Sequence, residues 1–321
     1  MKKVFAIICA VLMLLSMAAC GGNETGEDDT YVVGICQLVP HDALDAATEG
    51  FKQALIDELG DKVTFKEEVA AGDTASCAPI VNTFVADDVD LIMANATPAL
   101  QAAAAATEDI PILGTSVTEY GVALQIKNFT GTVGGNVSGT SDLAPLDQQA
   151  AMLLEWFPEA KNVGLLFCSA ESNSKYQVDE VQRMLEEKGV KCTQYAFTDS
   201  NDIQAIAQKA ADESDVIYIP TDNTAASNAP VIREVCTQGE KKVPIIAGEE
   251  GICAGCGVAT LSISYYDLGY TTGKMAAKVL TGEADISTMA VAYSEKFTKK
   301  YNKEICDELG LTPPDGYEAI S

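Results

Sequence analysis

The sequence predicts an α/β protein with two Rossmann-like lobes, each a parallel sheet with helices on both faces. Short apolar, strand-like runs alternate with helical patterns from residue 31 onward, and this alternation occurs as two successive series. An irregular join at 141–145 separates the two series. The chain has 321 residues, and 47% of them are hydrophobic. A chain of this length usually forms more than one hydrophobic core.

The first series begins at Tyr31. Leu44, Phe51 and Leu55 share one face of the helical segment that follows the first strand-like run. Two glycine-bounded segments, 121–126 and 136–141, break the alternation before the join. The strand-like runs of this series lie at 31–39, 63–70, 90–96 and 110–117.

The second series ends near residue 250, and a further strand and helix follow it at 258–264 and 265–282. A strand and helix beyond a complete second lobe predict that the chain returns to the first lobe. We therefore expect lobe one to comprise 31–142 with 265–282, and lobe two to comprise 143–264 with 283–321. Several crossings of this kind form a hinge, with a ligand groove between the lobes.

The N-terminal segment has the pattern of a cleaved secretion signal over 1–20, with two lysines, an apolar run at 4–15 and small residues. Cys20 followed by two glycines resembles a bacterial lipobox, in which this cysteine is lipidated. Met17 is unusual three positions before the cysteine, which leaves plain secretion open. Residues 21–30 are acidic, without large apolar side chains, and predict a solvated tether. We expect an extracytoplasmic body anchored to the membrane by lipid.

Composition restricts the class of partner. A net charge of −26 argues against nucleic-acid binding, because phosphates would be repelled. Cys36 and Cys168 lie in strand-like runs and are expected to be small core residues. Cys253 and Cys256 form a CxxC in what is expected to be a glycine-rich loop, a weak candidate for redox chemistry. A single histidine and the lack of a second CxxC argue against zinc, so no metal or cofactor is expected.

Five segments together resemble one known family, the ABC-transporter substrate-binding lipoproteins of the tryptophan/tyrosine-binding type. The resemblance implies a type I periplasmic-binding fold, a monomer, capture of a small amino acid (aromatic by preference) and delivery to an ABC permease. Glu119-Tyr120 departs from the proline that the family often has there, and the CAGC segment is also unusual. The segments are QLVPHDALDAATEGFKQAL, VDLIMANATPALQAAA, NVSGTSD, YIPTDNT and YYDLGYTTGKMAAKVL.

Candidate site residues follow from a rule for parallel sheets, in which ligands lie beyond the carboxyl ends of the strands. Polar residues follow the predicted strands in both lobes, and tyrosines are placed to pack on a ring or an apolar side chain. The candidates are Gln37, His41, Thr97, Ser116, Thr118 and Tyr120, together with Asn173, Ser174, Asp222, Asn223, Glu249 and Tyr265.

Neutral donors gather in lobe one and acids in lobe two. This division of the candidate residues predicts a zwitterionic ligand. Thr97 before Pro98 is expected to cap a helix, and its hydroxyl and the free backbone N–H groups could bind a carboxylate. An ammonium group would face Asp222 or Glu249. The structural alternative is that Thr97, Asn173 and Asp222 only cap the helices that follow them.

No catalytic arrangement emerges from the sequence, so we expect a protein that is not an enzyme. His41 is the only histidine and no GxSxG occurs. The segment 269–275, GYTTGKM, is one residue short of a phosphate-binding loop. A receptor for a sugar or another small signalling molecule, including an extracellular sensor, is the alternative. Trp156, the only tryptophan, is expected in a helix core and not in a sugar site.

Overall fold

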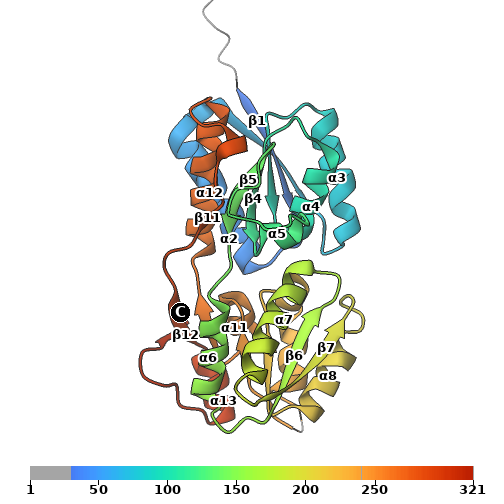
Figure 1. Cartoon of the computed structure of the whole chain (residues 1–321), viewed down its shortest axis with the longest axis vertical. Coiled ribbons are helices and arrows are strands. Elements are labelled where there is room, and N and C mark those ends of the chain that lie inside the picture. Colours follow the sequence, from blue (N-terminus) through green and yellow to red (C-terminus); the bar gives the residue numbers. More distant parts are fainter. Residues whose placement is uncertain (1–29, 240, 321) are drawn as a thin grey trace, which may run out of the picture. The chain divides into compact units, whose positions relative to one another are not determined.

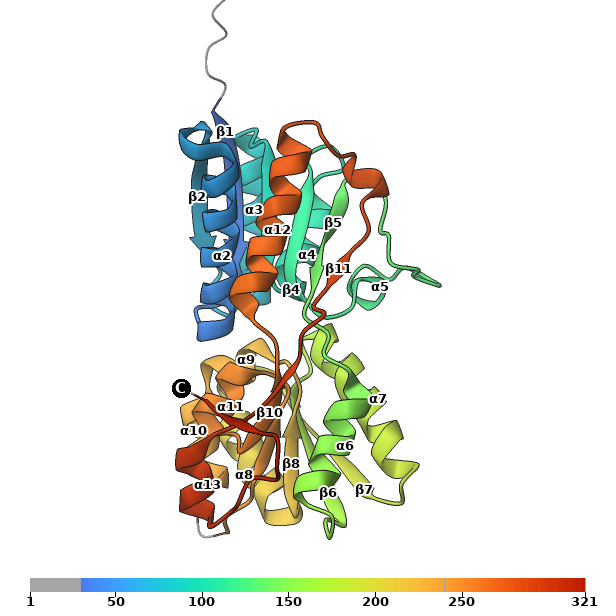
Figure 2. The ribbon, with the colours of Figure 1, turned by 90° about the vertical axis from the view of Figure 1, so that its left-hand side faces the viewer.

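The computed structural model describes residues 30–239 and 241–320, and Tyr31–Ser321 forms one compact unit. This unit contains two α/β lobes, each built on its own sheet (Figures 1 and 2). The predicted signal, the predicted lipidation site Cys20 and all but Thr30 of the acidic tether lie outside the described residues. Across the described ranges, no helix combines the length and apolar character needed to cross a bilayer.

Lobe one contains a six-stranded parallel sheet in the order β11-β5-β4-β3-β1-β2. Its central strands are buried along their whole length, which explains their continuous apolar sequences. The strands are β1 (Tyr31–Gln37), β2 (Val63–Val69), β3 (Leu91–Asn95), β4 (Ile112–Val117), β5 (Val137–Ser141) and β11 (Ala292–Tyr293).

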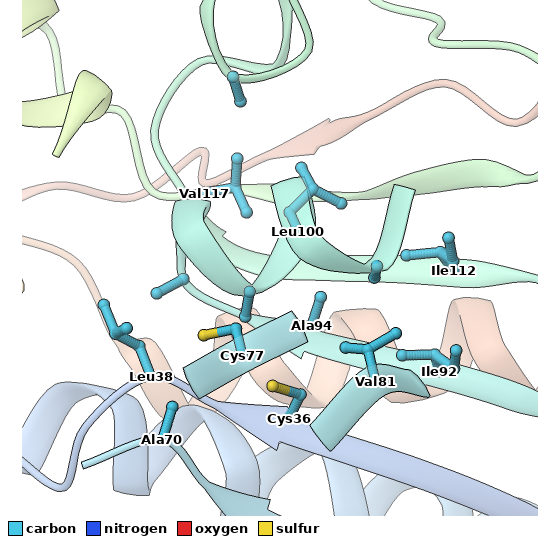
Figure 3. Close-up of a cluster of buried hydrophobic side chains, with 14 of the residues drawn as sticks. Cys36, Leu38, Ala70, Cys77, Val81, Ile92, Ala94, Leu100, Ile112 and Val117 are labelled. Atoms are coloured by element: carbon cyan, nitrogen blue, oxygen red, sulfur yellow. The ribbon is translucent and has the colours of Figure 1, made fainter. Parts of the chain in front are cut away.

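Helices cover both faces of this sheet. One face packs Phe51 and Leu55 against Ala276. The other packs Val81 and Leu100 into a core that also contains Cys36 (Figure 3). The helices are α2 (Asp42–Leu59), α3 (Cys77–Ala86), α4 (Thr97–Ala106), α5 (Tyr120–Ala123) and α12 (Tyr265–Leu280), with short 3-10 turns η1 (Gly60–Lys62), η2 (Thr74–Ser76) and η3 (Ile286–Thr288).

Lobe two contains a seven-stranded sheet in the order β13-β12-β10-β9-β8-β6-β7, in which only the β10–β12 pair is antiparallel. The strands are β6 (Asn162–Cys168), β7 (Lys191–Phe197), β8 (Val216–Ile219), β9 (Ile245–Ala247), β10 (Ala259–Ser262), β12 (Thr298–Tyr301) and β13 (Glu318–Ala319).

Two apolar cores hold helices on the faces of this second sheet. Trp156 is only 9% exposed and belongs to one of these cores, as expected from the sequence. The helices are α6 (Leu146–Trp156), α7 (Ser172–Glu186), α8 (Ile203–Glu213), α9 (Asn223–Ser227), α10 (Ala229–Cys236), α11 (Glu250–Cys256) and α13 (Lys303–Leu309).

The α/β class and the two-lobe arrangement are therefore confirmed, while three details differ from the sequence expectations. The segment 283–321 is divided between the lobes, because β11 at 292–293 pairs with β5 of the first sheet. Cys253 and Cys256 lie inside helix α11 and are buried, not in a loop. Thr97 is the first helical residue of α4 and its side chain makes no capping bond, since the N-cap position is Ala96.

Helices α2 and α12 approach closely because glycines line their contact. A methyl group built on Gly269 would lie 1.9 Å from the carbonyl oxygen of Ala47, and one on Gly50 would lie 2.1 Å from that of Tyr266. A Cβ on Gly273 would lie 2.5 Å from the carbonyl oxygen of Phe51. The glycines of GYTTGKM thus have a packing role, which accounts for the near match to a phosphate-binding loop.

Three chain segments cross between the lobes. The first, 142–145, joins β5 to α6, and the second, 263–264, joins β10 to α12. The third, 294–297, joins β11 to β12. These three segments form the hinge, and they leave the carboxyl ends of β5, β10 and β11.

Candidate functional site

A small cavity lies between the lobes next to the hinge. Most of its lining residues carry polar side chains, and they come from both lobes, so it is closed only when the lobes are together. The volume open to the centre of a water-sized sphere is about 10 Å³, which is room for about one water molecule. The lining residues are His41, Leu44, Ser116, Asp142, Asn173, Thr221, Asp222, Asn223, Ala226, Glu249 and Tyr265.

The backbone of lobe one is unusual near the carboxyl ends of β3 and β4. Ser116, next to last in β4, has φ 54°, and Ala96, after β3, has φ 97°. The pairing of β4 with β5 shifts register at this point, between Gly114 and Val117. Non-glycine residues in the left-handed region cost about 1–3 kcal/mol and cluster at functional sites. The strain at Ser116 thus lies within the cavity wall.

Several buried polar atoms of the cavity wall have no hydrogen-bond partner. Such atoms are rare in folded proteins, because each costs about 1–3 kcal/mol when left unpaired. Within the described residues, four of them belong to side chains that line this one cavity: His41 Nδ1, Ser116 Oγ, Asp142 Oδ1 and Asn173 Oδ1. Their concentration here indicates a site that binds a polar group.

The cavity is acidic. Burial raises the pKa of Asp142 to about 6 and that of Glu249 to about 7. The pKa of Asp222 is also raised, by burial first and then by the nearby charge of Glu171. None of the described lining residues is a lysine or an arginine, and burial lowers the pKa of His41. A cationic ligand group would therefore be favoured here.

Two of these acids also hold helices. Asp222 caps α9, where Oδ1 accepts from the Ala225 N–H at 2.8 Å, and Oδ2 accepts from the Cys168 N–H at 2.6 Å. Glu249 caps α11 by accepting from the N–H groups of Gly251 and Ile252. Helix capping, the structural alternative weighed from the sequence, therefore applies to Asp222 and also to Glu249.

Asp142 and Glu171 are functional candidates that the sequence analysis missed. The Tyr265 hydroxyl donates to Asp142 Oδ2 at 3.0 Å, and the polar side chains of Thr118 and Tyr265 partly offset the effect of burial on the Asp142 pKa. Glu171 is 1% exposed and accepts from the backbone and side chains of Asn223 and Thr224. Asp142 was detectable, because it ends the NVSGTSD segment at the join between the lobes.

The structure brings together seven of the twelve predicted site residues in the cavity wall. These are His41, Ser116, Asn173, Asp222, Asn223, Glu249 and Tyr265. The other five lie outside that wall: Gln37, Thr97, Thr118, Tyr120 and Ser174.

Physical reasons explain three of the five exceptions. Gln37 is buried in a network in which its Nε2 donates to Asp45 at 2.6 Å and its Oε1 accepts from Thr48 at 2.6 Å. Tyr120 is fully buried, its ring lies over Gly114, and its hydroxyl donates to the Thr140 carbonyl at 3.0 Å. Ser174 Oγ is turned toward the Thr221 carbonyl at 3.5 Å.

Direct contacts join the lobes beside the cavity. His41 Nε2 lies 3.3 Å from Asn223 Oδ1, and Gln101 Nε2 donates to Ser172 Oγ at 3.4 Å. A wider interlobe groove of about 360 Å³ shares Asn223 with the cavity and is lined by Leu38 and Cys168 among others. The cavity and this larger groove therefore lie on either side of Asn223, between the same two lobes.

Comparison with known proteins identifies the family to which this chain is similar. The sequence profile of a family described as ABC transporter substrate binding protein matches residues 32–318. A tyrosine-binding protein of Clostridioides difficile is 35% identical over 297 residues, which is 88% of this chain and 85% of that protein.

Two solved structures are informative as a pair. An ABC domain from Streptococcus pneumoniae in complex with L-Trp has a TM-score of 0.85 at 32% identity, covering 91% of this chain and all of that one. A ligand-free, open substrate-binding protein with adhesive properties from Clostridium difficile has a TM-score of 0.68 at 35% identity, covering 91% of this chain and 99% of that one. At similar identity and coverage, the chain is therefore more similar in overall structure to the tryptophan complex than to the open, ligand-free protein.

Proposed function

The chain belongs to the ABC transporter substrate-binding protein family, and on that premise we propose that it captures a small amino acid outside the cytoplasm and delivers it to an ABC permease. Aromatic amino acids are the proposed ligands. Support comes from the relatives, one described as tyrosine-binding and one solved with L-Trp. No chemical step on the ligand is part of this proposal.

One observation carries the proposal: four unpartnered buried polar atoms line a single cavity that both lobes close. Unpaired buried atoms cost stability, so a protein that keeps four around one space gains from a ligand that pairs them. A zwitterion suits this wall, since it offers donors from its ammonium group and acceptors from its carboxylate. The ammonium group would lie toward the acids and the carboxylate toward lobe one.

The carboxylate end has candidate donors in lobe one. Ser116 Oγ is unpartnered in the cavity wall, and Thr97 Oγ1 is also buried without a partner at the start of α4. The free N–H groups of a helix N-terminus and its positive dipole end favour an anion. Thr118, adjacent to this region, remains a predicted contributor.

Binding requires the lobes to separate and close again. The cavity admits about one water molecule, so an amino acid with an aromatic side chain cannot enter the closed arrangement. The wider groove beside the cavity is the natural path for the side chain. A ligand that contacts both lobes stabilises the closed state by its differential affinity for the two states.

The proposed location follows from the sequence. A signal peptide and a lipid on Cys20 would place the receptor outside the cytoplasm, and the acidic tether would hold it near its permease. Globomycin treatment of expressing cells and mass spectrometry of the mature N-terminus test the lipid. An unmodified Cys20 in a secreted product would refute the anchor without affecting the ligand.

A ligand screen tests the substrate class. The domain 30–321 would be titrated with amino acids, purines and sugars in a thermal-shift assay, with calorimetry of the compounds that raise the melting temperature. At a ligand concentration of 100 Kd the expected stabilisation is about 2.7 kcal/mol. Stabilisation by sugars alone would refute the amino-acid proposal and support the alternative receptor.

A further inference from the structure

We propose that Asp142, with Asn173 and His41, forms the site that binds the primary ammonium group of the ligand, an inference that rests on the proposed function. The three side chains come from different parts of the fold: the hinge, helix α7 of lobe two and the segment before α2 of lobe one. Each contributes one unpartnered buried atom to the cavity wall.

The acids differ in whether they have an oxygen free for a ligand. Both oxygens of Asp222 and both of Glu249 accept backbone N–H bonds. Both oxygens of Glu171 accept from Asn223 and Thr224. Asp142 alone among these four acids keeps one oxygen, Oδ1, without a partner, while Tyr265 holds the other. Asp142 is thus the acid available for a direct ionic contact.

The orientation of Asn173 is fixed by its neighbours. Its Nδ2 donates to the Thr221 carbonyl at 3.0 Å and lies 3.4 Å from Glu171 Oε2, and both of these oxygens can only accept from it. The amide oxygen of Asn173 is therefore the unpartnered atom in the cavity wall. It is an acceptor.

The proton on His41 is assigned by the same logic. Asn223 Nδ2 donates to Glu171 Oε2 at 2.6 Å, so Asn223 Oδ1 must accept. His41 Nε2, 3.3 Å from that oxygen, is then the nitrogen that carries the hydrogen. Burial lowers the His41 pKa, which favours the neutral ring. Nδ1 of His41 is therefore a third free acceptor.

Three free acceptors around a space of this size match one chemical group. A primary ammonium group has three N–H donors, a single positive charge and about the size of a water molecule. The cavity that these three residues line admits about one water, and no lysine or arginine among its described lining residues competes for Asp142. The site therefore selects a primary amine, and N-methylation should remove a required donor.

The experiment is calorimetric titration of L-tryptophan and L-tyrosine into the domain 30–321 and two variants. Asp142→Asn keeps the shape and removes the charge; Asp147→Asn makes the same change at an exposed position five residues later. A hydrogen bond to a charged group is worth about 1.5–3 kcal/mol, so Asp142→Asn should weaken binding about 10- to 150-fold. Asp147→Asn should bind as the wild type does.

The ligand can be varied instead of the protein, which avoids any folding defect. N,N,N-trimethyltryptophan keeps the positive charge without an N–H donor, and indole-3-propionate lacks the amine. Both should bind to the wild type at least about 10-fold more weakly than L-tryptophan. Trimethyltryptophan binding as tightly as L-tryptophan would overturn the inference.

The outcomes separate the two proposals. A wild-type protein that binds neither amino acid would overturn the proposed function and this inference with it. Equal binding of L-tryptophan by the wild type and by folded Asp142→Asn would overturn this inference alone.

Discussion

His41 of lobe one and Asn223 of lobe two meet across the cleft, with 3.3 Å between His41 Nε2 and Asn223 Oδ1. The contact lies at the edge of the cavity and joins segments 182 residues apart in the chain. This direct contact between the lobes therefore favours the closed state over the open one.

Removing this link should shift the ligand-free protein toward the open state. A neutral hydrogen bond contributes about 0.5–1.5 kcal/mol, so Asn223→Ala should lower the ratio of closed to open molecules about 2- to 13-fold. Small-angle scattering would record this as a larger radius of gyration. Asn82→Ala, exposed on α3, is the control and should leave the radius unchanged. An unchanged radius in Asn223→Ala would contradict the prediction.

Asp142→Asn should make the ligand-free protein more stable at neutral pH. The folded pKa is raised from 3.8 to about 6, so folding takes up a proton between these values and stability falls as pH rises. Above pH 6 the ionised, buried carboxylate of Asp142 destabilises the fold to its full extent. Removing the charge should therefore restore at most about 3 kcal/mol to the free energy of unfolding. Urea unfolding should show a gain of about 1–3 kcal/mol at pH 7.5 and a much smaller one at pH 4.

The stability test has its own control and its own contrary result. Asp147→Asn should change the free energy of unfolding little at either pH. The ionisable groups facing Asp142 are Tyr265, Tyr120 and Glu249, with Asp222 and His41 on the same cavity. A gain of equal size at both pH values would show that the Asp142 charge is not the cause.

Tyr265→Phe should move the pH dependence of ligand binding upward. The Tyr265 hydroxyl donates to Asp142 and helps to hold its pKa down, so its loss should raise that pKa above about 6. Because the ammonium group requires ionised Asp142, affinity should rise with pH, with a midpoint near 6 in the wild type and higher in the variant. Tyr266→Phe, at the exposed neighbouring position, should keep the wild-type midpoint.

Gly269→Ala should destabilise lobe one strongly. A Cβ at this position would lie 1.9 Å from the Ala47 carbonyl oxygen, so α2 and α12 must separate. Overpacking of this kind costs about 1–3 kcal/mol and sometimes more. Thermal unfolding should detect the loss, whereas Lys278→Ala on the exposed side of α12 should have little effect. A melting temperature equal to that of the wild type would contradict the close contact.

The buried CxxC should be chemically inert in the native protein. Burial raises the pKa of Cys253 and Cys256 well above the ordinary value, and the thiolate is the reactive form. Burial also raises the pKa of Cys192, to about 12, but Cys192 is the one half-buried cysteine among the eight described and should react first because reagent can reach it. Timed iodoacetamide labelling with peptide mass spectrometry checks the order. Rapid labelling of Cys253 in folded protein would be the contrary result.

The sequence predicted the fold well because periodicity and glycine placement are local signals. The two series of strands and helices alone indicated two parallel sheets, and Trp156 was correctly placed in a core. The tail was harder, since β11 is only two residues long and pairs across about 150 positions of sequence. A strand that short has no recognisable alternation.

Only some of the residues predicted for the site line the cavity, and the reason is physical. The rule of strand ends tells where the chain leaves a sheet, but it does not tell which way each side chain turns. His41 and Asn173 turn into the cavity, whereas Tyr120 turns over Gly114. Asp142 was missed because glycine interrupts the segment 136–141, which concealed the strand β5 that Asp142 directly follows.

The threefold crossing between the lobes has a consequence for evolution and for engineering. Neither lobe is a contiguous stretch of sequence, since 142–145, 263–264 and 294–297 all pass between them. A chimera that takes one lobe from a relative must therefore be spliced at three places. One of these places, 142–145, contains Asp142 of the cavity wall. New ligand preferences are consequently easier to reach by substitutions within the existing lobes than by exchange of whole ones, and a single protease cut at any one crossing leaves the halves tied by the other two.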